Sequence, residues 1–352
     1  MKVLLKHKIK SVLPVLAFGG LITIAAVLLM SIEIYEINPY EIEFGTFFMD
    51  RVSSNLTIIP LILVPVAVSL GIILTQEYGD REKEDFLSAI PIKSGQRFMA
   101  CILPGVIFFI VFGIALLIAV IVNYEISYDY YSEINMMSPY YEIISKMDGV
   151  GNAILHIVQI TLSMLMIFFI TVFASVSARN KMISVIVLAA ICAFPIYIPE
   201  AVNNITTGYF NIKMPLYDEI TNCASIGAMI EEGSYIYVGE IPCTYFEYST
   251  GKTIVSGGLL LIFAILSYLY AVKLDRLNGK IMVNKTAEVI FIITAGVYGV
   301  CIIPTFRNME NMKFGILAVT MCIVFAVIEI VLYRFITGKG RYSYLNAGGE
   351  KV

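Results

Sequence analysis

Eight apolar runs, each about as long as a lipid bilayer is thick, recur along the chain and constrain its fold most. They cover residues 12–31, 56–75, 99–122, 153–177, 182–199, 256–272, 287–305 and 314–334. Runs of about 18 or more apolar residues are typical of transmembrane helices, because a helix satisfies its own backbone hydrogen bonds in lipid. Only 14% of the residues are charged, against roughly a quarter in soluble domains. The sequence predicts an all-α, polytopic membrane helix bundle of about eight spans, forming a single transmembrane domain over 1–352.

The distribution of lysine and arginine predicts the orientation of this bundle. An even number of spans places both termini on one side of the membrane. Of the 24 basic residues, 18 lie in the segments on that side. These segments are residues 1–11, 76–98, 178–181 and 273–286 and the C-terminal residues from Arg334 onward. Because basic residues concentrate in cytoplasmic loops, we expect both termini to be cytoplasmic.

Three segments, 32–55, 123–152 and 200–255, are expected outside. The last has 56 residues and is too long to be a bare connection, so we expect an extracellular loop with structure of its own. Its tyrosines and isoleucines, among them Tyr235, Tyr237 and Ile241, suggest either short strands or interfacial helices. The pattern does not decide between the two.

Residues 76–98 form the most highly charged segment on the expected cytoplasmic side. Six charged residues follow one another from Asp80 to Asp85. A short helix here would place Phe86, Leu87 and Ile90 on one face, opposite the charges. Two interpretations are open. Either the apolar edge docks on a partner, or the segment is an ordinary charged loop whose short helix lies on lipid.

Motifs for chemistry within the chain are scarce. Gly251-Lys252-Thr253 matches the end of a phosphate-binding loop, but position 246, where its first glycine belongs, is Phe246. The histidines are His7 and His156, and we interpret His156 as a packed side chain rather than a ligand. Paired carboxylates, zinc-binding spacings and nucleophile motifs are missing. We therefore predict no catalytic residues, no metal site, no nucleic-acid partner and no enzymatic activity of the chain itself.

The six cysteines do not form a disulfide framework. Cys101, Cys192, Cys301 and Cys322 fall inside apolar runs, where cysteine usually acts as a small hydrophobic side chain. Cys223 and Cys243 share the 200–255 loop. They would form a disulfide in an oxidising compartment, or would stay free thiols.

The sequence Gln76-Glu77-x-Gly79, the charges after it and Phe86-Leu87-Ser88-Ala89-Ile90-Pro91 resemble a known pattern. It is the first cytoplasmic loop of permease subunits in the type-2 ATP-binding-cassette exporter family, and the likeness covers the first four spans in order and spacing. The resemblance implies that this loop is a coupling helix that docks on a separate ATPase subunit. The residues that it assigns to coupling are Glu77, Gly79, Asp80, Arg81, Glu84, Phe86, Leu87, Ile90 and Pro91.

With eight expected spans, the chain resembles the eight-span bacterial members of this family, whereas many other members have six spans. The resemblance implies that ATP and magnesium belong to the partner and that this chain has no cofactor. We thus expect the permease subunit of an exporter of peptide, lipid or amphipathic compounds in a bacterial cell membrane. Its partners would be ATPase subunits, a second identical or related permease, and the bilayer. The alternative is a non-transporting sensor or scaffold that recruits a cytoplasmic regulator.

Overall fold

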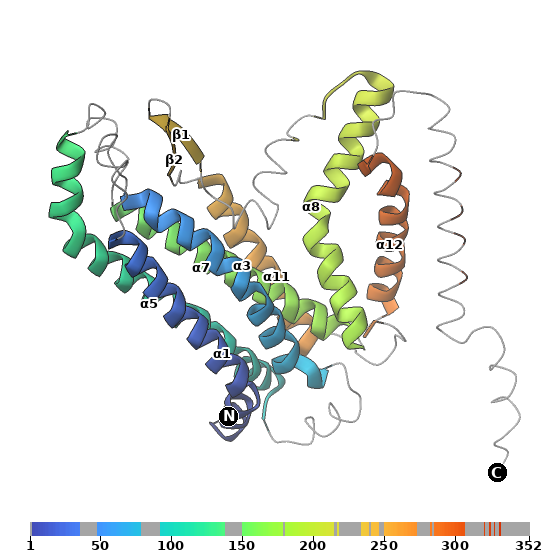
Figure 1. Cartoon of the computed structure of the whole chain (residues 1–352). Helices are drawn as coiled ribbons and strands as arrows, with labels where there is room; N and C mark the ends of the chain where they lie inside the picture. The colour runs from blue at the N-terminus through green and yellow to red at the C-terminus, as the bar shows by residue number, and fades with distance from the viewer. Residues whose placement is uncertain are drawn as a thin grey trace, which may run out of the picture. The chain divides into compact units, whose positions relative to one another are not determined.

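The computed structural model describes most of the first 306 residues, and its regular elements are helices apart from one hairpin. The described residues are 2–35, 48–78, 92–137, 150–178, 180–214, 217, 234–238, 241–245, 250–272, 282–283, 285–306, 320, 324, 327 and 331. The helices are α1 (Lys2–Tyr35), α3 (Phe48–Thr75), α5 (Ser94–Met137), α7 (Val150–Ser177), α8 (Lys181–Phe210), α11 (Thr250–Val272) and α12 (Lys285–Phe306), and a 3₁₀ turn, η1 (Gln76–Tyr78), follows α3 (Figure 1).

Six of the described helices are long and apolar enough to cross a membrane. The candidate spans are Val3–Leu29, Ile59–Tyr78, Ser94–Glu133, Ala153–Ser177, Lys181–Thr207 and Gly251–Val272, and α12 adds a shorter apolar stretch, Thr286–Gly299. Large apolar side chains such as Leu21 on α1 and Ile293 on α12 are more than 60% exposed. Such outward apolar faces suit lipid rather than water. The prediction of a helical, multi-pass membrane protein is confirmed. The run at 314–334 lies outside the described residues except for isolated helical positions.

The chain divides into two compact units. Unit one contains Met1–Gln76, Ser88–Phe173 and Ile226–Val272, and unit two contains Glu77–Leu87, Ala174–Ser225 and Lys273–Val352. Within unit one, α7 contacts α3, α5 and α11. A Cβ atom built on Gly105 of α5 would lie 2.5 Å from the Phe168 ring, and one on Gly71 of α3 would lie 2.7 Å from Cγ2 of Thr171. These glycines let the helix backbones approach closely, as in many membrane bundles.

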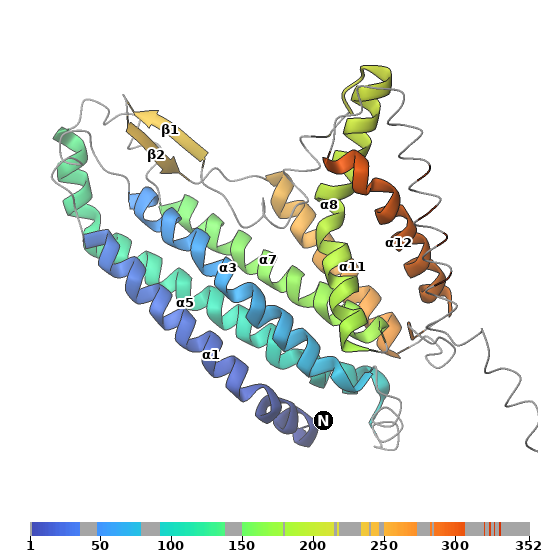
Figure 2. The same cartoon turned by 45° about the vertical axis from the view of Figure 1, so that its right-hand side comes forward.

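The helices of unit one run in two opposite directions (Figure 2). Four contacts between helices fix these directions. They are Lys8–Leu74 between α1 and α3, Ser31–Asn123 between α1 and α5, Phe98–Tyr268 between α5 and α11, and Gln159–Thr253 between α7 and α11. They show that α1 and α5 run one way, while α3, α7 and α11 run the other way. A chain that crosses a bilayer repeatedly requires this arrangement.

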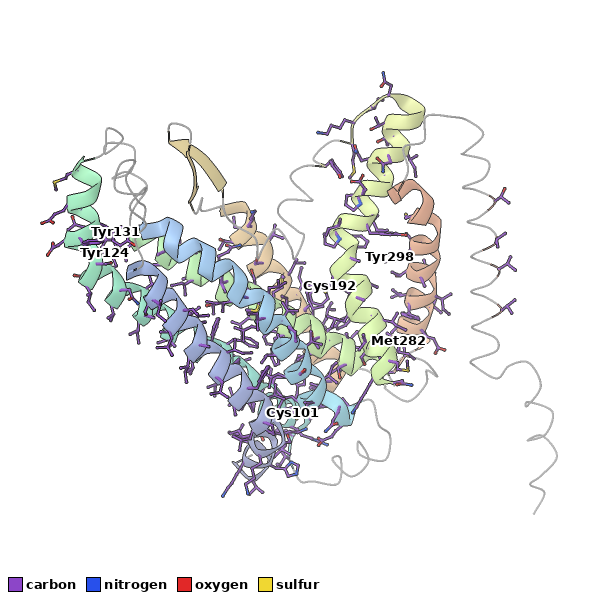
Figure 3. The ribbon with its side chains drawn as sticks, in the orientation of Figure 1. Cys101, Tyr124, Tyr131, Cys192, Met282 and Tyr298 are labelled. Carbon is purple, nitrogen blue, oxygen red and sulfur yellow. The ribbon has the colours of Figure 1, made fainter. Side chains whose placement is uncertain are left out.

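In unit two, α8 and α12 lie side by side and run in the same direction. The Tyr197 and Tyr298 rings stack with their centroids 5.2 Å apart. The Tyr197 hydroxyl donates to the Tyr298 carbonyl oxygen at 3.2 Å, and the Tyr298 hydroxyl donates to the carbonyl oxygen of Ala190. Tyr298 is labelled in Figure 3. Before the two helices begin, the Val283 amide donates to the Ser177 carbonyl oxygen at 2.8 Å. The connections that precede α8 and α12 therefore meet.

Part of the segment 200–255 forms short strands, one of the two structures that its tyrosine pattern suggested. Strands β1 (Ser234–Val238) and β2 (Ile241–Tyr245) form an antiparallel hairpin in which Ser234 pairs with Tyr245 and Val238 with Ile241. β2 contacts α3. Of the two open alternatives, short strands are correct for this stretch. The first residues of the segment are helical, because α8 continues to Phe210.

Helix α5 is much longer than the apolar run from which it was predicted. Its 44 residues span about 66 Å at 1.5 Å per residue, roughly twice the thickness of a hydrocarbon core. The part beyond residue 122 carries exposed acidic residues among four tyrosines, which are Tyr124, Tyr128, Tyr130 and Tyr131. Tyrosine is enriched at membrane–water interfaces, so this end of α5 has the composition expected of a helix leaving the bilayer.

Candidate functional site

The structure describes the two ends of the predicted coupling segment rather than its centre. Glu77 belongs to the turn η1, directly after α3. The other predicted coupling residues lie outside the described residues, and they are Gly79, Asp80, Arg81, Glu84, Phe86, Leu87, Ile90 and Pro91. Cys243 lies in β2, whereas Cys223 is outside the described residues, so their pairing stays a prediction. The candidate site is therefore built here from the end of α3 and the start of α5.

A buried lysine holds the end of α3. The Lys8 ammonium nitrogen donates to the carbonyl oxygen of Leu74 at 3.0 Å, and Lys8 is 1% exposed. The last four carbonyl groups of a helix have no partner within it, and a positive charge there also stabilises the helix dipole. Lys8 thus joins the start of α1 to the last turn of α3, immediately before the predicted coupling segment.

Helix α7 holds the same end of α3 from another side. Gly71 lies against the Cγ2 and Cβ atoms of Thr171, and the carbonyl oxygen of Gly71 accepts a hydrogen bond from the Thr75 hydroxyl at 2.5 Å. Threonine is stiff at χ1, so it gives α3 a rigid contact surface. The last turn of α3 is therefore fixed by two neighbouring helices, α1 and α7.

The start of α5 is fixed in turn by α11. Phe98 is buried, and its ring meets the ring of Tyr268 edge to face, with centroids 6.1 Å apart. One turn earlier, a Cβ atom built on Gly95 would lie 3.1 Å from the Tyr268 hydroxyl oxygen. The first turn is closed by the Arg97 amide, which donates to the Lys93 carbonyl oxygen at 3.0 Å. Tyr268 thus packs against the side of α5 that bears both Gly95 and Phe98.

These anchors give the candidate site a mechanical property. Residues 79–91 connect two helices, and each helix is held inside unit one by neighbours. A displacement of the end of α3 would reach α1 and α7, and a displacement of the start of α5 would reach α11. Because packed interiors have low compressibility, the helices would transmit the displacement rather than absorb it.

The sequence interpretation missed the role of Lys8. It did not distinguish among the four N-terminal lysines, yet Lys6 and Lys10 are exposed while Lys8 is buried. A periodicity signal was present, because Lys8 precedes the buried Val12 by four residues. It therefore shares a helix face with Gly19, Thr23 and Ala26, which are also buried or contact neighbouring helices.

Two other polar groups, His156 and Glu288, are also buried. His156 is 1% exposed, which agrees with a packed side chain. Glu288, at the start of α12, is 4% exposed. Within the part of the chain that the structure describes, no cluster of three or more histidine, cysteine, aspartate or glutamate residues could hold a metal ion.

Comparisons of the chain with protein-family models, curated proteins and solved structures find no match.

Proposed function

We propose that the chain is the membrane-spanning permease subunit of an ATP-binding-cassette exporter, driven by a separate ATPase. The observation that carries this proposal is the anchoring on both sides of residues 79–91, by Lys8 at α3 and by Tyr268 at α5. A subunit that is driven by ATP hydrolysis in a partner needs a contact segment that is stiffly joined to its transmembrane helices. The resemblance of residues 76–91 to the coupling loop of type-2 exporters supports the same role.

The proposed topology has eight spans, with both termini on the cytoplasmic side of a bacterial cell membrane. The contacts in each unit support it, because they join ends that the proposal places on one side. Lys8 meets the end of α3, Phe98 meets the end of α11, and the segments at 178 and 282–283 meet in unit two. The lysine and arginine distribution supplies the sidedness.

In the proposed mechanism, residues 80–90 form an amphipathic helix that docks on the ATPase. Asp80 to Asp85 keep one face in water, while Phe86, Leu87 and Ile90 enter a groove on the partner. Burial of each apolar side chain contributes roughly 1.5–3 kcal/mol, which is enough for a specific dock. ATP and magnesium are bound by the partner, whose closure then moves α3 and α5.

The proposed transporter contains two permease chains, identical or related, because one bundle supplies half of a transport path. We propose peptides, lipids or other amphipathic compounds as cargo. The acidic, tyrosine-rich external segments and the apolar outward faces of the helices support this class.

The test is ATP hydrolysis by the co-expressed ATPase, measured with reconstituted permease variants. We expect charge reversal at Asp80, Glu82 and Glu84, or proline insertion at 86–90, to abolish the stimulation of hydrolysis while the protein stays in the membrane. The matched control is Glu133→Lys, a charge reversal at the exposed far end of α5, which should leave the stimulation intact. Full stimulation by the 80–90 variants would refute the coupling role and favour the sensor or scaffold alternative.

A further inference from the structure

A polar stripe runs along a buried face of α7, inside one of the candidate membrane spans. His156, Gln159 and Ser163 follow one another at intervals of three and four residues, so they share one face of the helix. Each of them is at most 1% exposed. Farther along α7, the contacts with α11 are aromatic, where Phe173 meets Phe263 and Tyr270. His156, Gln159 and Ser163 all lie in the N-terminal half of α7.

Ser163 differs from other hydroxyl side chains in the helices. Thr161 and Thr171 of α7, Ser127 of α5 and Ser267 of α11 each donate to the carbonyl oxygen four residues earlier in their own helix. This back-bonding is the usual way to satisfy a hydroxyl group in a helix. The buried Oγ of Ser163 makes no hydrogen bond within the described structure.

The side-chain amide of Gln159 is hydrogen-bonded through its oxygen. Its Oε1 accepts a hydrogen bond from the Thr253 hydroxyl of α11 at 2.5 Å. Its Nε2 is buried and donates to no acceptor among the described residues. Gln159 and Ser163 therefore present N–H and O–H groups on one face, four residues apart. Buried polar groups in proteins are almost always hydrogen-bonded, to water where no protein partner exists.

We infer that His156, Gln159 and Ser163 form a water-accessible site, beside α11, that binds uncharged hydrogen-bonding groups. The site is polar but holds no charge of its own that would select an ion. Among the described residues of unit one, the buried charged side chain is Lys8. Lys8 lies near the C-terminal ends of α3 and α7, whereas the polar stripe lies in the N-terminal half of α7. Water is the first occupant, and the amide or hydroxyl groups of an amphipathic molecule have the same hydrogen-bonding chemistry. This inference does not rest on the proposed transport function.

Cysteine modification tests the presence of water. Methanethiosulfonate reagents react with the thiolate, which forms in water and is suppressed in apolar surroundings. The variant Ser163→Cys is treated with methanethiosulfonate ethylammonium in membrane fragments open on both faces, and each cysteine is followed by mass spectrometry. We expect Ser163→Cys to react at least about ten-fold faster than Cys101, a fully buried residue near the start of α5 (Figure 3).

The matched control is Thr171→Cys, which also replaces a buried hydroxyl on α7 but one that is already hydrogen-bonded. It should stay as protected as Cys101. Protection of Cys101 in every variant shows that the bundle remains folded. Adding Gln159→Leu to Ser163→Cys should return the rate to the level of Cys101. The inference is wrong if Ser163→Cys is protected, since the stripe would then be dry, or if Gln159→Leu leaves its rate unchanged.

Discussion

Lys8 anchors the end of α3 through a single charged group. Its ammonium group is buried and contacts a carbonyl group at the very end of a neighbouring helix, 66 residues away in the sequence. A hydrogen bond from a charged group contributes about 1.5–3 kcal/mol. An ordinary surface lysine contributes far less. Lys8 therefore adds to the packing of Thr171 against Gly71 in holding the last turn of α3.

Replacing Lys8 with methionine tests this role. Methionine keeps the volume and the apolar stem but leaves the Leu74 carbonyl group without its donor. We expect hydrogen exchange of the amides at 74–78 to rise on the order of ten-fold, because the last turn then opens more often. Lys10→Met, at an exposed position two residues later, is the control. Equal exchange in the two variants would show that Lys8 does not hold α3.

The glycines show what a sequence predicts at this scale and what it does not. Gly19, Gly105 and Gly113 face side chains of neighbouring helices, as small residues in apolar runs allow. Gly20 comes directly after Gly19 in the same apolar run, yet it faces open space. Neighbouring residues point about 100° apart on a helix, so only the rotation of the packed helix decides which glycine meets a partner. That rotation follows from tertiary contacts.

At the scale of elements, α8 and α12 form a pair joined along its length. Their connections meet at Ala178 and Met282, and their tyrosines stack farther along. The two segments, 178–181 and 273–286, were predicted on the same side of the membrane from their basic residues alone. Their contact in unit two is what that prediction requires.

A disulfide cross-link measures this contact. Bridged residues in antiparallel strands have Cα atoms about 4.5–5.5 Å apart, within the range of a disulfide. We expect Ala178→Cys with Met282→Cys to cross-link under mild oxidation, as read from peptide mass after proteolysis. The control pair, Ala201→Cys with Met282→Cys, places one cysteine near the far end of α8 and should stay reduced. Cross-linking of the control pair alone would mean that α8 and α12 run in opposite directions.

Helix positions follow from hydropathy, whereas helix ends do not. The first seven apolar runs all fall on described helices, but α5 continues to Met137 and α8 to Phe210. A helix that leaves the bilayer is no longer required by lipid to be apolar, so its continuation depends on propensity and capping. For α8 the end is marked by Asn211, which adopts a left-handed conformation with φ 52°, as a helix C-cap often does.

At the scale of the whole molecule, we propose that a partner acts on the charged segment 76–98 and thereby moves the packed helices of unit one. The sequence predicted the segment, its side of the membrane and its apolar edge. It could not predict the anchors, because Lys8 and Leu74, or Phe98 and Tyr268, are far apart in the chain and meet only in the fold. Which partner the segment contacts depends on how well the two surfaces fit. The sequence of one chain does not include the partner's surface.

The most direct test of this account is purification of the chain from its native membranes in mild detergent. We predict that an ATPase chain with a Walker A phosphate-binding loop co-purifies in a constant ratio. We also predict that Phe86→Asp with Leu87→Asp removes the ATPase but leaves the permease in the membrane, and that Glu133→Lys has no effect. Purification of the wild-type chain without an ATPase, or an ATPase retained by the double variant, would contradict the proposed docking at 76–98.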